Sequence, residues 1–176
     1  MPKFIFFDYN KEKIYQYQQV LKNNSNMSFY FGTLKDVMKN FNIDILVSPA
    51  NSFGIMTGGI DRDIAEMYPM VVDNVNAKLK QSKSFDSGGR QFIPVGDCEA
   101  VSLDNKNKLM LIAPTMFLPK NIEGTNNVFV AFKAILKLTS VLPHNVLIAC
   151  PCLGTGVGGL SGTTSAMQVL QAVKYS

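Results

Sequence analysis

The sequence of 176 residues has little of the chemistry that zinc centres and nucleophilic hydrolases use. It holds one histidine and three cysteines. A Ser-His-Asp or Cys-His mechanism would have to use His144, which no motif surrounds, so we expect an ordinary loop residue there. Cys98, Cys150 and Cys152 are an odd number with no second ligand pair. They predict reduced, buried thiols rather than a disulfide framework or a metal site.

Long apolar runs and dense charge runs are also missing. No apolar run reaches the ~18 residues of a membrane span, and the run that ends before Asp8 is too short for a signal-peptide core. We therefore expect a cytoplasmic protein with no membrane partner, in the host cytoplasm if the asparagine- and lysine-rich chain is viral. The net charge is +4, but the lysines are scattered along the chain. Nucleic-acid binding concentrates such charge on one face, so we expect no nucleic-acid partner.

Apolar residues make up 47% of the chain and charged residues 17%, which favours a packed globule. The length predicts a single domain over residues 1–176, and we expect a monomer. Hydrophobic periodicity predicts strands at 4–7, 28–31, 43–48, 91–95, 100–103, 108–113 and 146–150. It predicts helices at 11–21, 34–39, 60–68, 70–80, 126–140 (N-cap Thr125) and 163–174. This alternation predicts an α/β fold whose mixed, mostly parallel sheet has helices on both faces.

Two of the three most apolar strands are followed by glycine-rich loops. Gly58 and Gly59 precede the helix at 60–68, and the sequence CLGTGVGG over 152–159 precedes the last helix. Glycine lets successive backbone N–H groups approach an anion closely, and a helix start adds a favourable dipole. Ligands of such sheets bind beyond the carboxyl ends of the strands. The two loops together therefore predict a site for a diphosphate.

The motifs around these loops resemble those of macro domains, which are three-layer α/β/α modules that bind ADP-ribose. The stretch IDILVSPANSFGIMTGGIDRDI resembles the first family signature, CPCLGTGVGG resembles the second phosphate loop, and LMLIAPTM matches the strand between them. The motifs Ser-Pro-Ala-Asn-Ser-Phe-Gly and Ala-Pro-Thr-Met look closest to the bacterial and viral branch. The resemblance extends over residues 28–174.

The sequence departs from the family pattern in three places. Ser48 replaces the first asparagine of the signature, and Thr33 stands where many members carry an aspartate that contacts the adenine. Asp36 or Asp8 can take over that contact. The chain also ends soon after its last helix, while FIFFDYNKEKIYQYQQVL resembles the strand and helix that many members add there. We therefore predict a circular permutation, with Asp8 and Tyr9 at the adenine end of the site.

The resemblance implies roles for the matching residues. The backbone of Gly58, Gly59 and Ile60 would hold one phosphate, and Asn51 would bond the distal ribose. Asp61 would orient or deprotonate a water, although an acid in a first helical turn also stabilises the helix without any catalysis. The second phosphate would lie on Gly154, Thr155, Gly156, Val157 and Gly158. The remaining ligand contacts that we predict are Leu34, Ala50, Ser52, Met56, Thr57, Pro114 and Thr115.

The implied function is to bind ADP-ribose, or an ADP-ribosylated substrate, and to hydrolyse a group from its distal ribose. The group could be an ADP-ribosyl ester, an acetyl ester or a 1″-phosphate. The enzyme would be a metal-independent ADP-ribosyl hydrolase or ADP-ribose 1″-phosphate phosphatase that needs no cofactor. Two alternatives stay open: a non-catalytic module for ADP-ribose or another NAD-derived metabolite, and a protein that binds RNA through its basic surface.

Overall fold

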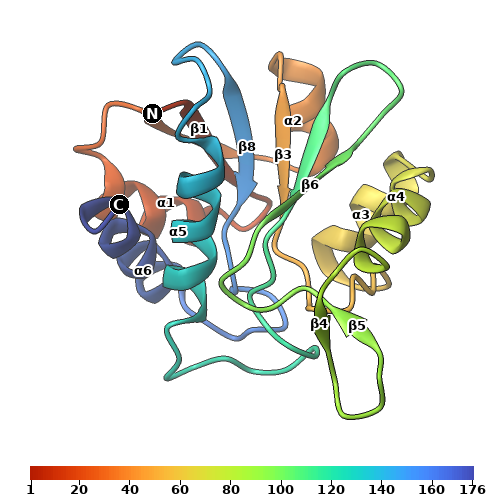
Figure 1. Ribbon diagram of the computed structural model, residues 1–176. Coiled ribbons are helices and arrows are strands. Elements are labelled where there is room, and N and C mark those ends of the chain that lie inside the picture. The colour runs from red at the N-terminus through yellow and green to blue at the C-terminus, as the bar shows by residue number, and fades with distance from the viewer.

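The computed structural model describes residues 1–176, and its centre is a six-stranded sheet (Figure 1). The strand order is β2-β1-β8-β3-β7-β6. Only β6 runs antiparallel to its neighbour, so the mixed, mostly parallel sheet that the sequence predicted is confirmed. The strands of this sheet are β1 (Lys3–Asp8), β2 (Met27–Phe31), β3 (Ile45–Ser48), β6 (Glu99–Ser102), β7 (Leu109–Ile112) and β8 (Leu147–Pro151).

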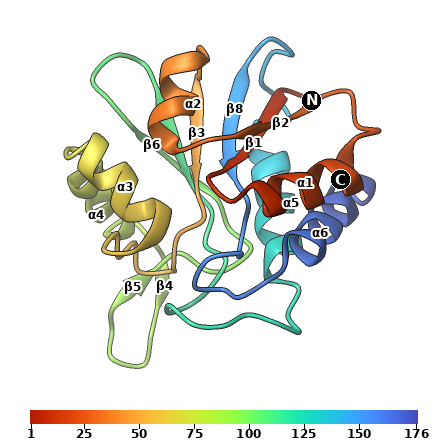
Figure 2. The same ribbon diagram turned by 180° about the vertical axis from the view of Figure 1, so that it is seen from behind.

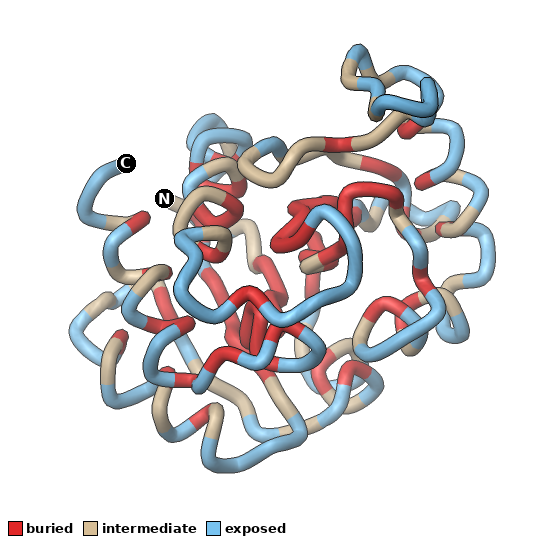
Figure 3. The backbone as a smooth tube through the Cα atoms, turned by 90° about the horizontal axis from the view of Figure 1, so that it is seen from below, coloured by how far each residue is buried: buried red, intermediate tan, exposed pale blue.

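Six helices cover the two faces of the sheet in two groups (Figures 1 and 2). One face carries α1 (Lys11–Leu21), α5 (Asn127–Thr139) and α6 (Gly162–Lys174). The other carries α2 (Leu34–Asn40), α3 (Gly59–Met67) and α4 (Val71–Leu79). Each group packs on its own hydrophobic cluster, and Figure 3 shows the buried segments gathered in the middle of the molecule. No helix is long and apolar enough to cross a membrane.

Strand β1 lies inside the sheet and pairs in parallel with both β2 and β8. Its side chains alternate between the two hydrophobic clusters: Phe4 and Phe6 face the α1 side, and Ile5 and Phe7 face the α3 side. All four are at most 2% exposed. A continuous apolar run is therefore what this position requires, because a strand covered on both faces has no polar side. The N-terminal strand thus pairs within the sheet, beside the strand of the second glycine loop, as predicted.

Two local predictions are wrong. The strand predicted at 91–95 is only Gln91–Phe92 (β5), which pairs with Ser84–Phe85 (β4) in a separate hairpin. Pro94 has no N–H for a ladder and Gly96 turns with a φ of +99°, so the extended run ends early. The N-cap of α5 is Asn126, one residue later than predicted, although the Thr125 hydroxyl accepts the Asn127 N–H at 3.4 Å while it donates to the carbonyl oxygen of Ile122.

Candidate functional site

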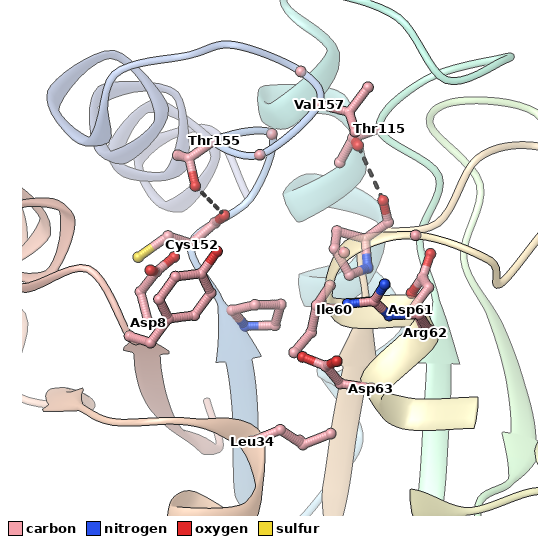
Figure 4. Close-up of a pocket in the computed structure, with 18 of the residues that line it drawn as sticks. Asp8, Leu34, Ile60, Asp61, Arg62, Asp63, Thr115, Cys152, Thr155 and Val157 are labelled. Carbon is pink, nitrogen blue, oxygen red and sulfur yellow. Dashed lines mark hydrogen bonds between the residues drawn. The ribbon is translucent and has the colours of Figure 1, made fainter. Parts of the chain in front are cut away.

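A cleft of about 480 Å³ opens at the carboxyl ends of the parallel strands. Five strand ends contribute to it: those of β1, β2, β3, β7 and β8, each through the first residues of the loop that follows. Figure 4 shows two walls, one formed by Asp8, Cys152 and Thr155 and the other by residues 60–63 of α3, with Leu34 below them. The strands therefore bring together segments from five separate parts of the chain.

The wall formed by α3 begins with the first glycine pair. Gly58 is the N-cap and forms no side-chain cap, so the N–H groups of the first turn have no partner within the helix. Gly59 has a φ of +56°, in the left-handed region, and a Cβ there would meet nothing within 4 Å. Both glycines line the cleft together with Thr57 and Ile60. The start of α3 thus presents bare backbone donors and a positive dipole end to the cleft.

The second glycine loop connects β8 to α6 and is held by its own backbone. The Leu160 N–H donates to the Gly154 carbonyl at 3.1 Å, and the Ile122 N–H donates to the Gly158 carbonyl at 2.9 Å. A Cβ on Gly158 would lie 2.4 Å from the Gly154 oxygen, so only glycine fits that position. Residues 154–158 all line the cleft opposite α3. The two glycine loops that the sequence singled out therefore face one another across one cavity.

Asp61 is a buried carboxylate at the cleft, in the first turn of α3. Its side chain is 8% exposed, and its Oδ1 accepts a hydrogen bond of 2.6 Å from the Ser48 hydroxyl at the end of β3. Burial raises the pKa of Asp61 to about 6, and the Ser48 bond opposes part of that rise. The carboxylate makes no ion pair. A group that titrates near neutral pH is suited to accept a proton from water.

The Asn51 side chain is used within its own loop. Its Oδ1 accepts the N–H groups of Phe53 and Ile55, and its Nδ2 donates to the Ile55 carbonyl. Asn51 lines the cleft, and one N–H of the amide is left for another partner. The hydrogen bonds of the Asn51 side chain therefore stabilise the turn after β3, and this turn brings residues 57–61 to the cleft.

The two aspartates considered for the adenine end lie in different places. Asp8 lines the cleft at the end of β1, where its Oδ1 accepts the Asn10 N–H. Asp36 is bound in the capping box of α2, in which its Oδ2 accepts from both the N–H and the hydroxyl of Thr33. The N–H bond is the main reason that the pKa of Asp36 is lowered. Asp8 is thus the aspartate available to a ligand.

The cysteines are free and mostly buried. Cys152 lines the cleft, but burial raises the pKa of its thiol well above the usual range, as it does for Cys150. Both thiols are therefore protonated and packed near neutral pH, as the sequence led us to expect. His144 is exposed in a loop. No group of three or more metal-type side chains is placed to hold an ion.

Most of the residues predicted for the site line this cleft. Those that do not are buried beneath it or beside it, where they support the loops through backbone bonds such as that from the Thr115 N–H to the Ala50 carbonyl. The predicted residues that line the cleft are Asp8, Tyr9, Leu34, Asn51, Thr57, Gly58, Gly59, Ile60, Asp61, Thr115, Gly154, Thr155, Gly156, Val157 and Gly158. The predicted residues outside the lining are Ala50, Ser52, Met56 and Pro114.

Three charged side chains at the cleft were not predicted. Arg62 and Asp63 follow Asp61 on α3, and Lys13 reaches the cleft from α1. The start of α3 was already placed at the site, so its next two residues could have been inferred. Lys13 lies four residues after Tyr9, in the first turn of α1, and the permutation that we predicted would have pointed to it.

Comparisons with known proteins agree with this architecture. A family model described as Macro domain matches residues 47–169. An uncharacterized protein of Aquifex aeolicus (strain VF5) is 26% identical over 142 residues, covering 80% of this chain and 79% of that protein. The macrodomain of Mycobacterium tuberculosis DarG has a TM-score of 0.61 at 19% identity, covering 77% of this chain and 84% of that one. A mutant Oceanobacillus iheyensis macrodomain with ADPR has a TM-score of 0.57 at 16% identity, covering 77% and 72%. At these identities the two solved structures show a shared fold.

Proposed function

This chain belongs to the macro domain family, and we propose that its cleft binds ADP-ribose or a close derivative and hydrolyses a group from the distal ribose. The related macrodomain with ADPR supports the choice of ligand. The observation that carries the proposed reaction is the Asp61 carboxylate, buried against Ser48 at the α3 wall of the cleft with a pKa of about 6.

The ligand's charged and neutral parts suit different parts of the cleft. The diphosphate lies between the first turn of α3 and residues 154–158, where backbone N–H groups replace its water. The adenine lies toward Asp8 and Leu34, and the carboxylate of Asp8 accepts a hydrogen bond from the adenine amino group. The distal ribose then lies at the α3 wall, next to Asp61. Thr115, from the loop after β7, lies between the two glycine loops in Figure 4.

Asp61 acts as the general base in this scheme. Ser48 occupies Oδ1, which leaves Oδ2 to bind a water. Deprotonated Asp61 takes a proton from that water as the water oxygen attacks the acyl carbon or phosphorus of the group to be removed. The bond from that atom to the ribose oxygen breaks, and the ribose oxygen takes the proton from Asp61 and leaves as a hydroxyl, which restores the ionised carboxylate. Oriented backbone donors around the diphosphate hold the substrate in place for this attack.

The test compares wild type with Asp61→Asn, which keeps the shape and the acceptor for Ser48 but cannot take a proton. We expect ADP-ribose to bind both proteins in the micromolar range by calorimetry. Turnover of at least one of three substrates, an ADP-ribosyl ester, O-acetyl-ADP-ribose or ADP-ribose 1″-phosphate, falls on the order of 100-fold in the variant. Wild-type turnover rises with pH through about 6 as Asp61 loses its proton.

Asp73→Asn is the matched control, because Asp73 is also a first-turn acid, on α4, but is exposed and away from the cleft. It should leave both binding and turnover unchanged. Equal turnover in wild type and Asp61→Asn would remove Asp61 from the mechanism. Absence of ADP-ribose binding in the wild type would overturn the proposed function itself.

The occupied side chain of Asn51 favours a second candidate, a module that binds ADP-ribose without hydrolysing it. An amide that already bonds three backbone groups of its own loop has little left to orient a ribose. This candidate predicts a saturable calorimetric signal with ADP-ribose and no product from any of the three substrates by chromatography.

A further inference from the structure

Helix α1 contacts the second glycine loop at two points that are one helical turn apart. The Lys13 ammonium donates to the Thr155 carbonyl at 2.9 Å, and the Tyr17 hydroxyl accepts the Leu153 N–H at 3.0 Å. Residues four apart lie on one face of a helix, so a single stripe of α1 supports the loop. These contacts come from the N-terminal strand and helix, outside the glycine motifs and outside residues 47–169.

Tyr17 belongs to a closed ring of three hydrogen bonds. The Ser165 hydroxyl of α6 donates to the Leu153 carbonyl, so the 2.6 Å bond between Tyr17 and Ser165 has the tyrosine as donor. The Leu153 N–H completes the ring by donating to Tyr17. Tyr17 and Ser165 are each 0% exposed. Both backbone polar groups of the residue before Gly154 are therefore fixed by buried side chains, which sets where the glycine loop begins.

Lys13 differs from Tyr17 because it lies at the surface of the cleft. Its side chain is half-buried and lines the cavity, and the Thr155 bond uses one of its three N–H donors. The other cation in the lining, Arg62, is 60% exposed and pairs with Glu66. The acids in the lining are Asp8, Asp61 and Asp63. Lys13 is thus the cation held against residues 154–158, in a cleft whose acids would otherwise oppose an anion.

We propose that Lys13 is a binding residue for the anionic group on the second glycine loop and that Tyr17 is a positioning residue for the same loop. The free N–H groups of Lys13 reach a phosphate oxygen from the Thr155 side, while the backbone of residues 154–158 holds it from the other. The proposal rests on the proposed function, in that the anionic group is taken to be the ligand's diphosphate. It adds a charge-dependent contact to a site otherwise built from backbone dipoles.

The test separates the diphosphate from the nucleoside. Wild type, Lys13→Met, Lys13→Arg and Tyr17→Phe are titrated with ADP-ribose and with adenosine, at a temperature where all four are fully folded. We expect Lys13→Met and Tyr17→Phe to weaken ADP-ribose binding about five- to tenfold and to leave adenosine binding unchanged. Lys13→Arg keeps the charge and should recover part of the loss. The salt dependence of ADP-ribose binding should be weaker in Lys13→Met than in wild type.

Two variants on the same helix serve as controls. Lys11→Met removes an exposed lysine, and Tyr15→Phe removes the hydroxyl of a tyrosine that is 60% exposed. Neither should change the binding of either ligand. Equal affinity of Lys13→Met and wild type for ADP-ribose, or a parallel loss of adenosine binding, would overturn the role of Lys13. The same results for Tyr17→Phe would show that Tyr17 packs in the core without positioning the second glycine loop.

Pyrophosphate distinguishes failure of this proposal from failure of the proposed function. We expect it to raise the melting temperature of wild type more than that of Lys13→Met, because a ligand that binds only the native state stabilises it in proportion to its affinity. Wild type that responds to pyrophosphate through Lys13 but does not bind ADP-ribose would support the anion site and refute the proposed ligand. Equal responses in the two proteins would refute the role of Lys13 in binding the anion.

Discussion

At the scale of single residues, Asp61 experiences two opposing effects. A carboxylate in the first turn of a helix is stabilised by the dipole, by roughly 0.3–1 kcal/mol. Burial without a cation acts the other way and raises the pKa of Asp61 from 3.8 to about 6, which corresponds to about 3 kcal/mol. The cost of burial is the larger effect, so the ionised side chain destabilises the fold.

This balance predicts that Asp61→Asn is more stable than wild type at pH 8, by up to about 3 kcal/mol. Below pH 3.8 Asp61 is protonated in both the folded and the unfolded chain, so its burial costs little. As pH rises from 3.8 through about 6, the unfolded chain releases its proton first, and stability is lost. The advantage of the variant should therefore appear over this range and shrink toward pH 4. Urea unfolding at pH 4.5 and pH 8 measures it.

The comparison with Asp73→Asn separates burial from the helix dipole. Asp73 is exposed in the first turn of α4, so its removal should cost about 0.3–1 kcal/mol at pH 8. The two variants are thus expected to change stability in opposite directions. A loss of stability in Asp61→Asn at pH 8 would show that Asp61 acts mainly through the dipole. A gain that does not change with pH would show that the gain does not come from the ionisation of Asp61.

At the scale of elements, the second glycine loop depends on one close backbone approach. A Cβ at Gly158 would lie 2.4 Å from the Gly154 oxygen and 3.0 Å from Cγ1 of Ile122. To relieve these contacts, either the Gly154 backbone or the packed Ile122 side chain would have to move, and both movements cost energy. We predict that Gly158→Ala destabilises the protein by about 1–3 kcal/mol and weakens ADP-ribose binding by displacing residues 154–158. Thermal unfolding and calorimetry measure the two effects.

Gly156→Ala is the matched control in the same loop. Gly156 is exposed, its φ is not positive, and a Cβ there would meet nothing within 4 Å. Its melting temperature should stay within about 2 °C of wild type. If both alanine variants lose stability equally, the sensitivity of the loop comes from backbone freedom in general and not from the contact with Gly154.

Element boundaries show what local sequence could and could not predict. Helix α1 begins and ends where predicted, because Asn10 caps it and its apolar positions repeat at helical spacing. The start of α5 was misplaced by one residue, because the N-cap is Asn126 even though the Thr125 hydroxyl accepts the Asn127 N–H. Asn51 lines the cleft, but the sequence did not show that most of its hydrogen-bonding capacity is used by Phe53 and Ile55. Polar side chains with a choice of neighbours were the difficult cases.

At the scale of the whole molecule, the site is assembled from contacts between distant parts of the chain. The glycine loops could be predicted because their composition is local. The contact between Lys13 and Thr155 joins residues 142 apart, and that between Tyr17 and Leu153 joins residues 136 apart. No local pattern carries such information. It follows only once β1 is known to lie between β2 and β8, which carries α1 to the second loop.

The placement of β1 predicts that residues 23–176 alone do not fold cooperatively, because they lose an interior strand whose Phe4 and Phe6 are at most 1% exposed. A permutant restores it: residues 25–176, a flexible glycine-serine linker, then residues 1–22. Both termini lie on the same side of the sheet in Figures 1 and 2. Since the permutant keeps the β1 contacts and the Lys13 and Tyr17 bonds, we expect cooperative unfolding and wild-type ADP-ribose affinity. A truncated chain that unfolds cooperatively and binds ADP-ribose as wild type does would show that β1 and α1 are dispensable for the site.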